Sequence, residues 1–481
     1  MTSSRDLADA AVRAAAALDG CIAVVRESSD ANLRWARNTL TTTGESRSRD
    51  ITLIGFRSTS GGTATATVSL ASPDAERLPD LVTRLSTALA SAPPAEDAAP
   101  LVAGGPVDQW PDSAPQTDGS VFTSTATDLG GMFRSALARD VELFGYAEHA
   151  IHSTWLASST GLRRHHSQPQ GRLEITAKSH ARSRSAWWGA ATDTFADIDW
   201  SDAEAALTQS LAWQGRVWDV APGRHRVVLT PGAVGDLMVD LWWSATAREA
   251  VEGRSVFSAA DRRQPDTSSG HGLQAQGPRG LGSTRIGERL STLPITLASD
   301  PDDPEIPAAA FLAAATSSDH ASVFDGGSPL GRVDWIRDGR LASLMAGRRF
   351  AEDHGLPFVA SPDTIRLDVL AGQAVTDDLV RGVDAGLLIT CLWYNRVVDP
   401  QTLLLTGLTR DGVFVVRDGE VIGAAGNFRF NDSPVGMLGR IRRAGVTRRT
   451  LPREMGDYAP RVAMPALDVD DFNLSTRSDA L

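Results

Sequence analysis

Histidine and cysteine are the first residues to examine, because imidazole and thiolate groups bind zinc and histidine is the commonest catalytic base. The chain has 9 histidines and 2 cysteines among 481 residues. Two histidine pairs lie close in sequence, His149 with His152 and His165 with His166. Residues around the first pair alternate as in a strand, where side chains three positions apart point to opposite faces, so this pair cannot bind one metal ion. We interpret the second pair, which follows two arginines, as a solvated turn.

The two cysteines, Cys21 and Cys391, each lie within an apolar run. This context predicts buried thiols on strands, because a zinc site needs more ligands at closer spacing. The sequence also contains no Gly-x-Ser-x-Gly turn of a serine hydrolase and no Walker loop for phosphate. These common catalytic motifs are therefore excluded.

Arginine and tryptophan supply the candidate contacts to other molecules. Arg442 and Arg443 belong to an arginine cluster that could bind a peptide carboxylate or an acidic partner surface, although a solvated basic loop is the simpler interpretation. Each of two Trp-Trp pairs is predicted to place one ring in a core and the other at an interface, where tryptophan is enriched. The interface candidates are Trp188 and Trp243.

Composition limits the classes of partner and the compartment. The 47 basic residues stand against 59 acidic ones, and the net charge of -12 repels nucleic-acid phosphate unless the basic groups cluster strongly. No stretch approaches about 18 uninterrupted apolar residues, so we expect no membrane span. Residues 1–20 include charged side chains and lack an apolar stretch with a cleavage site, which indicates a helix rather than a signal peptide. These features fit a cytoplasmic protein.

The helices and strands expected from the sequence indicate an α+β fold with two domains, which must position the candidate residues. A chain of 481 residues with 42% hydrophobic content is too long for one ordinary core. The first domain, at residues 1–217, is expected to be α+β with an antiparallel meander. Its strands are expected at 21–25, 33–40, 50–58 and 62–70, its helices at 4–18, 74–90, 128–139 and 202–214, and a proline-rich loop at 91–119.

The second domain, at residues 218–481, is expected to be mostly antiparallel β. A strand at 223–230 leads into a helix at 234–250, and composition indicates a long loop at 258–285. Residues 413–422 predict a hairpin, because an Asp-Gly turn supplies the positive φ angles that two twisted strands require.

Four groups of residues, in order along the chain, resemble the TldD/PmbA family. Together they extend over roughly residues 25–425, and the resemblance implies the two-domain fold of that family. The matching segments are 27–38 with 54–57 and 61–64; 254–257 with 285–290 and Asp300-Pro301; the Phe-Asp-Gly-Gly-Ser-Pro run at 324–329 with 336–341; and 386–390 with 406–407 and 417–421.

In catalytic members of the family, the resemblance implies a helix whose His-Glu-x-x-x-His supplies two zinc ligands and a general base, and a cysteine ligand near the C-terminus. In this chain Pro231 stands at the first histidine, Gly232 at the glutamate and Asp236 at the second histidine. The cysteine position falls near Pro452. Proline and glycine side chains offer neither a ligand atom nor a base, so hydrolysis by this chain alone is not expected.

The resulting hypothesis is a non-catalytic subunit of the TldE/PmbA type. Such a subunit pairs with a TldD-type catalytic subunit as a heterodimer and supports proteolysis of small or unfolded peptides at the partner's zinc. We expect no catalytic residue and no cofactor in this chain. A self-dimer stays open, since an interface built for a homologous partner can accept a second copy.

Two alternatives remain. One is a metal-dependent peptidase with displaced ligands, taken from His225, His271, His320 or His354, although these histidines share no ligand spacing. The other is a modulator that binds another protein such as DNA gyrase, which only the family's older name suggests.

Overall fold

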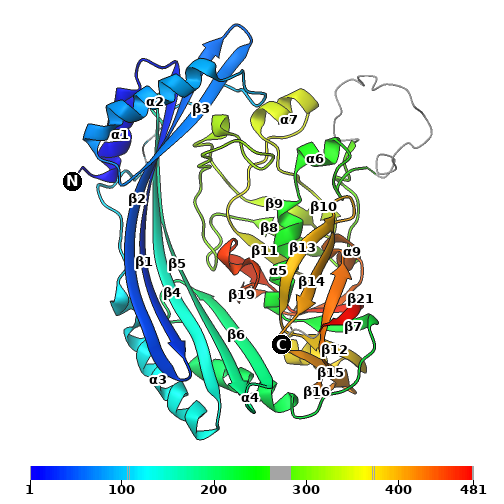
Figure 1. Ribbon diagram of the computed structural model, residues 1–481. Helices are drawn as coiled ribbons and strands as arrows, with labels where there is room; N and C mark the ends of the chain where they lie inside the picture. Colours follow the sequence, from blue (N-terminus) through cyan, green and yellow to red (C-terminus); the bar gives the residue numbers. More distant parts are fainter. Residues whose placement is uncertain are drawn as a thin grey trace.

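Three β-sheets form two bodies that stand side by side (Figure 1). The computed structural model describes residues 2–105, 107, 109–259, 283–370, 372 and 374–478. One long, curved sheet builds the first body, and the other two sheets lie in the second body. The fold is mixed α+β with mostly antiparallel strand pairs, which confirms the predicted fold class.

The first sheet is antiparallel throughout and has the strand order β3-β2-β1-β4-β5-β6. Its strands are β1 (Gly20–Ala36), β2 (Thr39–Thr59), β3 (Gly62–Ala71), β4 (Glu142–Ser158), β5 (Arg163–Ser179) and β6 (Arg184–Thr192).

Four helices pack against one face of this sheet. Two of them cover one end through leucine-rich faces, and the other two cover the opposite end through a second apolar cluster. Figure 1 shows α1 and α3 on the side of the sheet that faces away from the second body. The helices are α1 (Ser4–Ala14), α2 (Leu78–Ser91), α3 (Thr123–Ala138) and α4 (Trp200–Trp213).

Strand β1 shows how the two faces of the sheet differ. Cys21, Ala23 and Val25 point to the helices and are buried there. Ile22 and Val24 point the other way and pack in a cluster with apolar side chains of the second body. Because strand side chains alternate, this single strand joins the helix layer to the second body.

The strands of the first sheet are longer than the sequence predicts. Residues 21–25 and 33–40 were expected as separate strands, yet β1 runs unbroken from Gly20 to Ala36. Residues 27–32 are mostly polar, but β2 and β4 pair with them on both sides. Pairing with two neighbours therefore overrides weak local propensity, which is usual for strands.

The second body contains two sheets, each with one parallel pair, β11 with β20 and β12 with β7. One sheet has the order β10-β9-β8-β11-β20-β19: β8 (Ile295–Ser299), β9 (Val333–Arg337), β10 (Arg340–Leu341), β11 (Ile365–Val369), β19 (Arg448–Thr450) and β20 (Val462–Met464). The other has the order β13-β14-β17-β21-β7-β12-β15-β16, with β18 on β21: β7 (Gly223–Leu229), β12 (Ala385–Ile389), β13 (Leu392–Asp399), β14 (Leu404–Thr409), β15 (Val413–Arg417), β16 (Glu420–Ala424), β17 (Asn427–Asp432), β18 (Ile441–Ala444) and β21 (Leu467–Ser478).

Helix α5 lies in the largest apolar cluster of the second body and contacts strands of both sheets. The helix expected at 234–250 begins earlier, at Pro231, and ends at Trp243, after which a short separate helix follows. The helices of this body are α5 (Pro231–Trp243), α6 (Ala247–Val251), α7 (Arg348–His354), α8 (Thr376–Arg381) and α9 (Pro434–Leu438).

Two local predictions have definite outcomes. β15 and β16 form the expected hairpin, and Asp418 and Gly419 at its turn have φ angles of 49° and 81°. The loop expected at 258–285 lies almost entirely outside the described residues. Among the helices of the described residues, none is long and apolar enough to cross a membrane.

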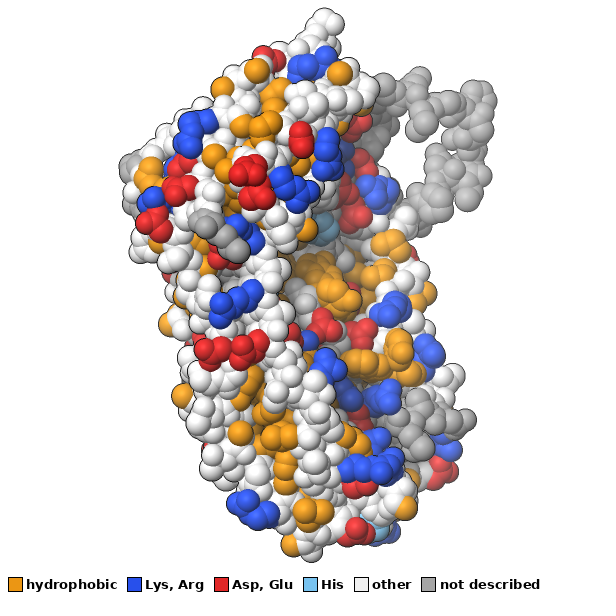
Figure 2. Space-filling model, turned by 60° about the vertical axis from the view of Figure 1, so that its left-hand side comes forward, with side chains coloured by type: hydrophobic (Ala, Val, Ile, Leu, Met, Phe, Trp, Pro, Cys, Tyr) orange, Lys and Arg blue, Asp and Glu red, His pale blue; other side chains and the backbone are white. Residues whose placement is uncertain are grey.

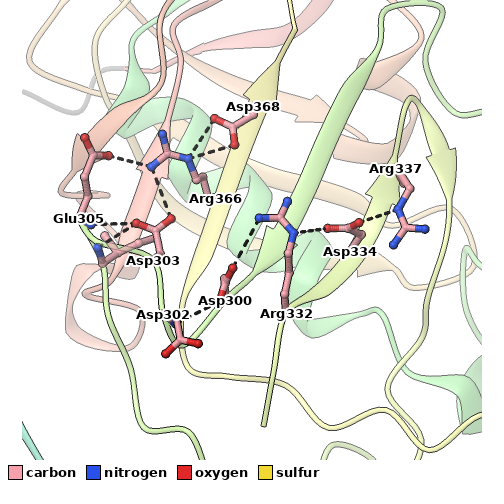
Figure 3. A network of polar contacts seen from close by, with 10 residues as sticks. Asp300, Asp302, Asp303, Glu305, Arg332, Asp334, Arg337, Arg366 and Asp368 are labelled. Atoms are coloured by element: carbon pink, nitrogen blue, oxygen red, sulfur yellow. Dashed lines mark hydrogen bonds and ion pairs between the residues drawn. The ribbon is translucent and has the colours of Figure 1, made fainter.

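A network of ion pairs fixes the edge of the β8–β11 region (Figure 3). Arg366 lies 2.7 Å from Glu305 and 3.0 Å from Asp368, and Arg332 lies 3.0 Å from Asp334. Apart from the exposed Asp302, each acidic group labelled in the figure has a guanidinium partner or a backbone N–H donor. This acidic cluster is therefore structural, since nearly all of its charges are already paired.

Candidate functional site

The hexapeptide singled out in the sequence forms the first turns of helix α5. Thr230 is the N-cap, and Pro231 takes the first helical position, where its missing N–H costs nothing. Strand β7 ends at Leu229 and delivers the chain to this point. Pro231 and Asp236 are buried, so the helix start faces the interior.

The segment around Pro452 lies directly against this helix. A Cβ added to Gly235 would lie 2.9 Å from Pro452 Cγ, and one added to Gly232 would lie 3.1 Å from the Leu451 carbonyl oxygen. Two stretches more than 200 residues apart in sequence thus meet. Gly232 and Asp236 therefore lie beside the segment that contains Pro452, and Pro231 directly precedes Gly232 on the same helix.

Asp236 holds the C-terminal segment in place. Its Oδ1 accepts hydrogen bonds from the backbone N–H groups of Glu454 at 2.9 Å and Met455 at 3.1 Å. Its Oδ2 is buried and has no hydrogen-bond partner. Burial raises the pKa of Asp236 well above its usual range, against the opposing effect of the two N–H donors. Burial therefore favours the neutral form of Asp236, whose hydrogen bonds hold the backbone of residues 454 and 455.

Asp240 lies one turn further along α5 and is also buried. Burial raises its pKa to about 7, and the negative charge of Glu454 adds to that shift. Glu454 is held by the guanidinium of Arg396 at 3.0 Å and by the backbone N–H of Tyr394 at 3.0 Å. Glu454 therefore acts electrostatically on both buried carboxyl groups of α5, Asp236 and Asp240.

The donor set does not fit zinc. Pro231, Gly232 and Pro452 have no ligand atom, and one oxygen of Asp236 is occupied by two N–H groups. The described residues contain no group of three or more histidine, cysteine, aspartate or glutamate side chains arranged to hold a metal ion. Zinc needs three or four such donors in a tetrahedral arrangement. No catalytic step through a metal follows from these residues.

The histidines proposed as displaced ligands do not converge. His225 pairs with the Ala221 carbonyl at 2.9 Å, and His320 with the Trp243 carbonyl at 2.8 Å. His354 bonds to the carbonyl of Phe350 and stacks on its ring. His271 lies outside the described residues. Each described candidate is engaged by nearby backbone rather than by another ligand.

The paired histidines of the first body lie on strands. His149 is buried and bonded to Thr117 Oγ1 at 2.7 Å and to the Asp193 carbonyl at 2.8 Å, whereas His152 is exposed. The interpretation of His165 and His166 as a turn is wrong, because both lie within β5 and pair with β4. His165 packs on Trp155, and burial lowers its pKa, with the charge of His166 adding to the effect.

Arg442 and Arg443 lie on strand β18 rather than on a solvated loop, so that interpretation is wrong. Arg443 donates to the fully buried Asp468 at 2.9 Å and to the Leu379 carbonyl at 2.6 Å. Arg442 is half exposed and pairs with Asp470 at 3.1 Å. Of the two arginines, Arg442 has the more exposed guanidinium, so it is the better placed to bind an external anion. Its contact with a partner stays a prediction.

The tryptophan candidates are half-buried. Trp188 packs against the apolar cluster beneath α3 and α4. Trp243 meets the ring of Tyr458 at 6.3 Å in an edge-to-face arrangement, while its neighbour Trp242 is 5% exposed. Trp243 is thus the candidate with a surface-exposed neighbour, since the Tyr458 side chain that it contacts is 70% exposed. Contact of either ring with a partner stays a prediction.

The sequence analysis did not identify Arg453, which lies beside α5 and contacts both bodies. Its guanidinium lies 5.2 Å from the ring of Trp187 in the first body and 5.3 Å from the ring of Trp393 in the second. It also forms an ion pair with the buried Asp411 and donates to Cys391 Sγ at 3.0 Å. No local sequence signal marks this residue, because Trp187 and Trp393 lie far from it along the chain.

A cavity of about 530 Å³ lies between the two bodies. On one side it is lined by strands β1, β2, β4 and β5, and on the other by residues that directly follow the Pro452 segment, including Asp457, Tyr458 and Arg461. Figure 2 shows the hollow between the bodies, where hydrophobic side chains gather beside acidic and basic ones. The degenerate site therefore adjoins a cavity large enough for a small ligand.

The family of the chain follows from its second half. The family model described as the PmbA/TldA metallopeptidase C-terminal domain matches residues 222–476, and the chain belongs to the TldD/PmbA family. No curated protein sequence matches the chain.

Solved structures share the fold over nearly the whole chain. TldE from Thermococcus kodakarensis is 14% identical, with a TM-score of 0.71, covering 97% of this chain and 99% of that one. A candidate modulator of DNA gyrase from Thermotoga maritima is 13% identical, with a TM-score of 0.71 and coverage of 97% and 99%. Another from Bacteroides thetaiotaomicron is 12% identical, with a TM-score of 0.71 and coverage of 98% and 98%. These similarities establish the fold.

Proposed function

We propose that this protein is a non-catalytic subunit that pairs with a TldD-type catalytic chain in the cytoplasm and supports peptide hydrolysis at the partner's zinc. The observation that carries the proposal is the replacement of the ligand set. Pro231, Gly232 and Pro452 meet at the site without a donor atom, and Asp236 is used to hold the backbone of residues 454 and 455.

The surroundings of the site support a structural role for this subunit. Helix α5 and the Pro452 segment are in van der Waals contact, and Asp236 and Asp240 favour their neutral forms through burial. A peptidase site needs a general base and an electrophile to activate water. Pro231, Gly232 and Pro452 offer no ligand for a metal electrophile, and the packing of α5 against the Pro452 segment stabilises the wall of the adjoining cavity.

The experiment that tests the proposal mixes the purified chain with the TldD-type chain encoded in the same genome. Peptide cleavage is measured for each chain alone and for the mixture, and complex formation is measured by size-exclusion chromatography with light scattering. The matched control is a partner whose His-Glu-x-x-x-His glutamate is replaced by glutamine.

The proposal expects a mixed complex whose peptidase activity disappears with the glutamine variant of the partner. Cleavage by this chain alone, or cleavage that survives that variant, would show that this chain carries its own catalytic site. A stable monomer that never associates with the partner would contradict the subunit role.

A further inference from the structure

The cavity between the bodies is closed on two sides by contacts of different kinds. On one side Ile22 and Val24 of β1 pack in one apolar cluster with Phe311 and Phe324 of the second body. On the other side Arg449 of β19 pairs with Asp193 just after β6, at 2.7 Å. The part of the sheet between these contacts lines the cavity.

The inner face of the sheet changes from apolar to polar at this point. After Ile22 and Val24, the next inward residues of β1 are Arg26 and Ser28, and strand register extends each of them into a row across β2, β1, β4 and β5. All members of both rows line the cavity. The rows are Asp50-Arg26-Thr154-His166 and Ser48-Ser28-His152-Gln168. We call these eight residues the polar wall.

Several groups of the polar wall keep free hydrogen-bonding capacity. His152 uses one ring nitrogen, Nδ1, on Ser28 Oγ at 3.1 Å, and His166 uses Nε2 on Gln168 Oε1 at 3.0 Å. The other nitrogen of each imidazole has no protein partner among the described residues. Among the described residues, Arg26 donates one hydrogen bond, to the Ala313 carbonyl at 3.2 Å, and also interacts electrostatically with Asp50. The wall thus presents donors and acceptors side by side, because hydroxyl, amide and imidazole groups can act as either.

The opposite wall carries charges that are already paired. Asp363 pairs with Arg461, which also donates to Gln170 at 3.1 Å, and Asp457 pairs with Arg172. Tyr458 adds an aromatic ring to the imidazoles of His152 and His166 that also line the cavity. Because the charges of this wall are paired, it does not favour a polyanion, which needs unpaired cations.

We propose that the polar wall binds an extended, polar peptide segment of about four residues, an inference that rests on the proposed function and adds to it a peptide site on this chain. Four strands about 4.8 Å apart span about 14 Å, and four extended residues at about 3.4 Å each have the same length. A peptide backbone alternates N–H donors with C=O acceptors, which matches the mixed groups of the wall.

The test measures binding by isothermal titration calorimetry on the full chain, with an unlabelled Ser-Gly-Asn-Ser tetrapeptide as the probe. Maltotetraose serves as the comparison ligand of similar length and polarity. The wall variant is His152→Leu with His166→Leu, and Thr154→Val is a second, nearly isosteric variant for the case in which the double variant does not fold. Thr42→Leu is the matched control, since Thr42 is exposed and pairs with Arg34 on β1, outside the cavity.

The proposal expects binding of the tetrapeptide by the wild-type chain and by Thr42→Leu, and binding about tenfold weaker after loss of both imidazoles. It is overturned when millimolar tetrapeptide gives no binding to the chain or to its complex, when the wall variants bind as well as the wild type, or when only maltotetraose binds. Binding to the isolated chain needs no partner. Tetrapeptide binding together with an inactive mixture would therefore refute the proposed function and leave this site standing.

Discussion

Asp240 makes the stability of the second body depend on pH in an unusual direction. Its carboxyl group is buried on α5, and its pKa is raised from the ordinary 3.8 to about 7, first by burial and then by the charge of Glu454. The folded state therefore holds a proton that the unfolded state releases at lower pH. Stability from this group is fully present below about pH 4 and is lost as the pH rises to about 7.

The magnitude follows from the size of the shift. The pKa of Asp240 rises by about 3, and each pKa unit corresponds to about 1.4 kcal/mol. The free energy of unfolding therefore changes by about 4 kcal/mol at most. Replacing Asp240 with asparagine removes the titration. The difference in unfolding free energy between wild type and Asp240→Asn should change by about 1.4 kcal/mol per pH unit between about pH 5 and pH 7 and level off above that range.

The assay is urea unfolding at several pH values, followed by the fluorescence of the tryptophans at the end of α5. The control is Asp302→Asn, which changes an exposed acid elsewhere in the second body. Effects of pH on groups that do not interact with Asp240 cancel in the difference between wild type and variant. A difference that does not change with pH, or that changes equally for Asp302→Asn, would refute the reasoning.

Two further substitutions test the contacts around the degenerate site. Asp236→Ala should destabilise the protein by about 2–5 kcal/mol, because it leaves the buried N–H groups of Glu454 and Met455 without their acceptor; hydrogen exchange of those two amides should accelerate, and unchanged exchange would contradict the assignment. Arg453→Met should cost about 3–5 kcal/mol, because Asp411 would remain buried without its partner. Adding Asp411→Leu to that variant should restore part of the loss in thermal unfolding, and an additive loss would argue against the ion pair.

Sequence reasoning succeeded where local pattern decides the structure. The Asp-Gly hairpin at β15 and β16 follows from turn chemistry alone, and the helix expected at 74–90 is found as α2, which buries leucines at helical spacing. The family resemblance was confirmed, and it identified residues from distant parts of the chain, Gly232 and Pro452, that the fold brings to one place.

Sequence reasoning failed where partners far along the chain decide. The polar residues 27–32 are strand only because β2 and β4 pair with them, and Arg443 is a structural residue only because Asp468 lies beneath it. The polar wall was missed for the same reason. Alternation in β1 places Arg26 and Ser28 on one face, but only the register with three other strands shows that they form rows.

The zinc content of the purified chain tests the central claim most directly. After incubation with equimolar zinc and removal of free metal, elemental mass spectrometry on the chain alone should show no stoichiometric zinc, whereas the TldD-type partner treated in the same way should retain it. One zinc ion per molecule of this chain, lost on Asp236→Ala, would show that the degenerate site binds metal and would contradict the account.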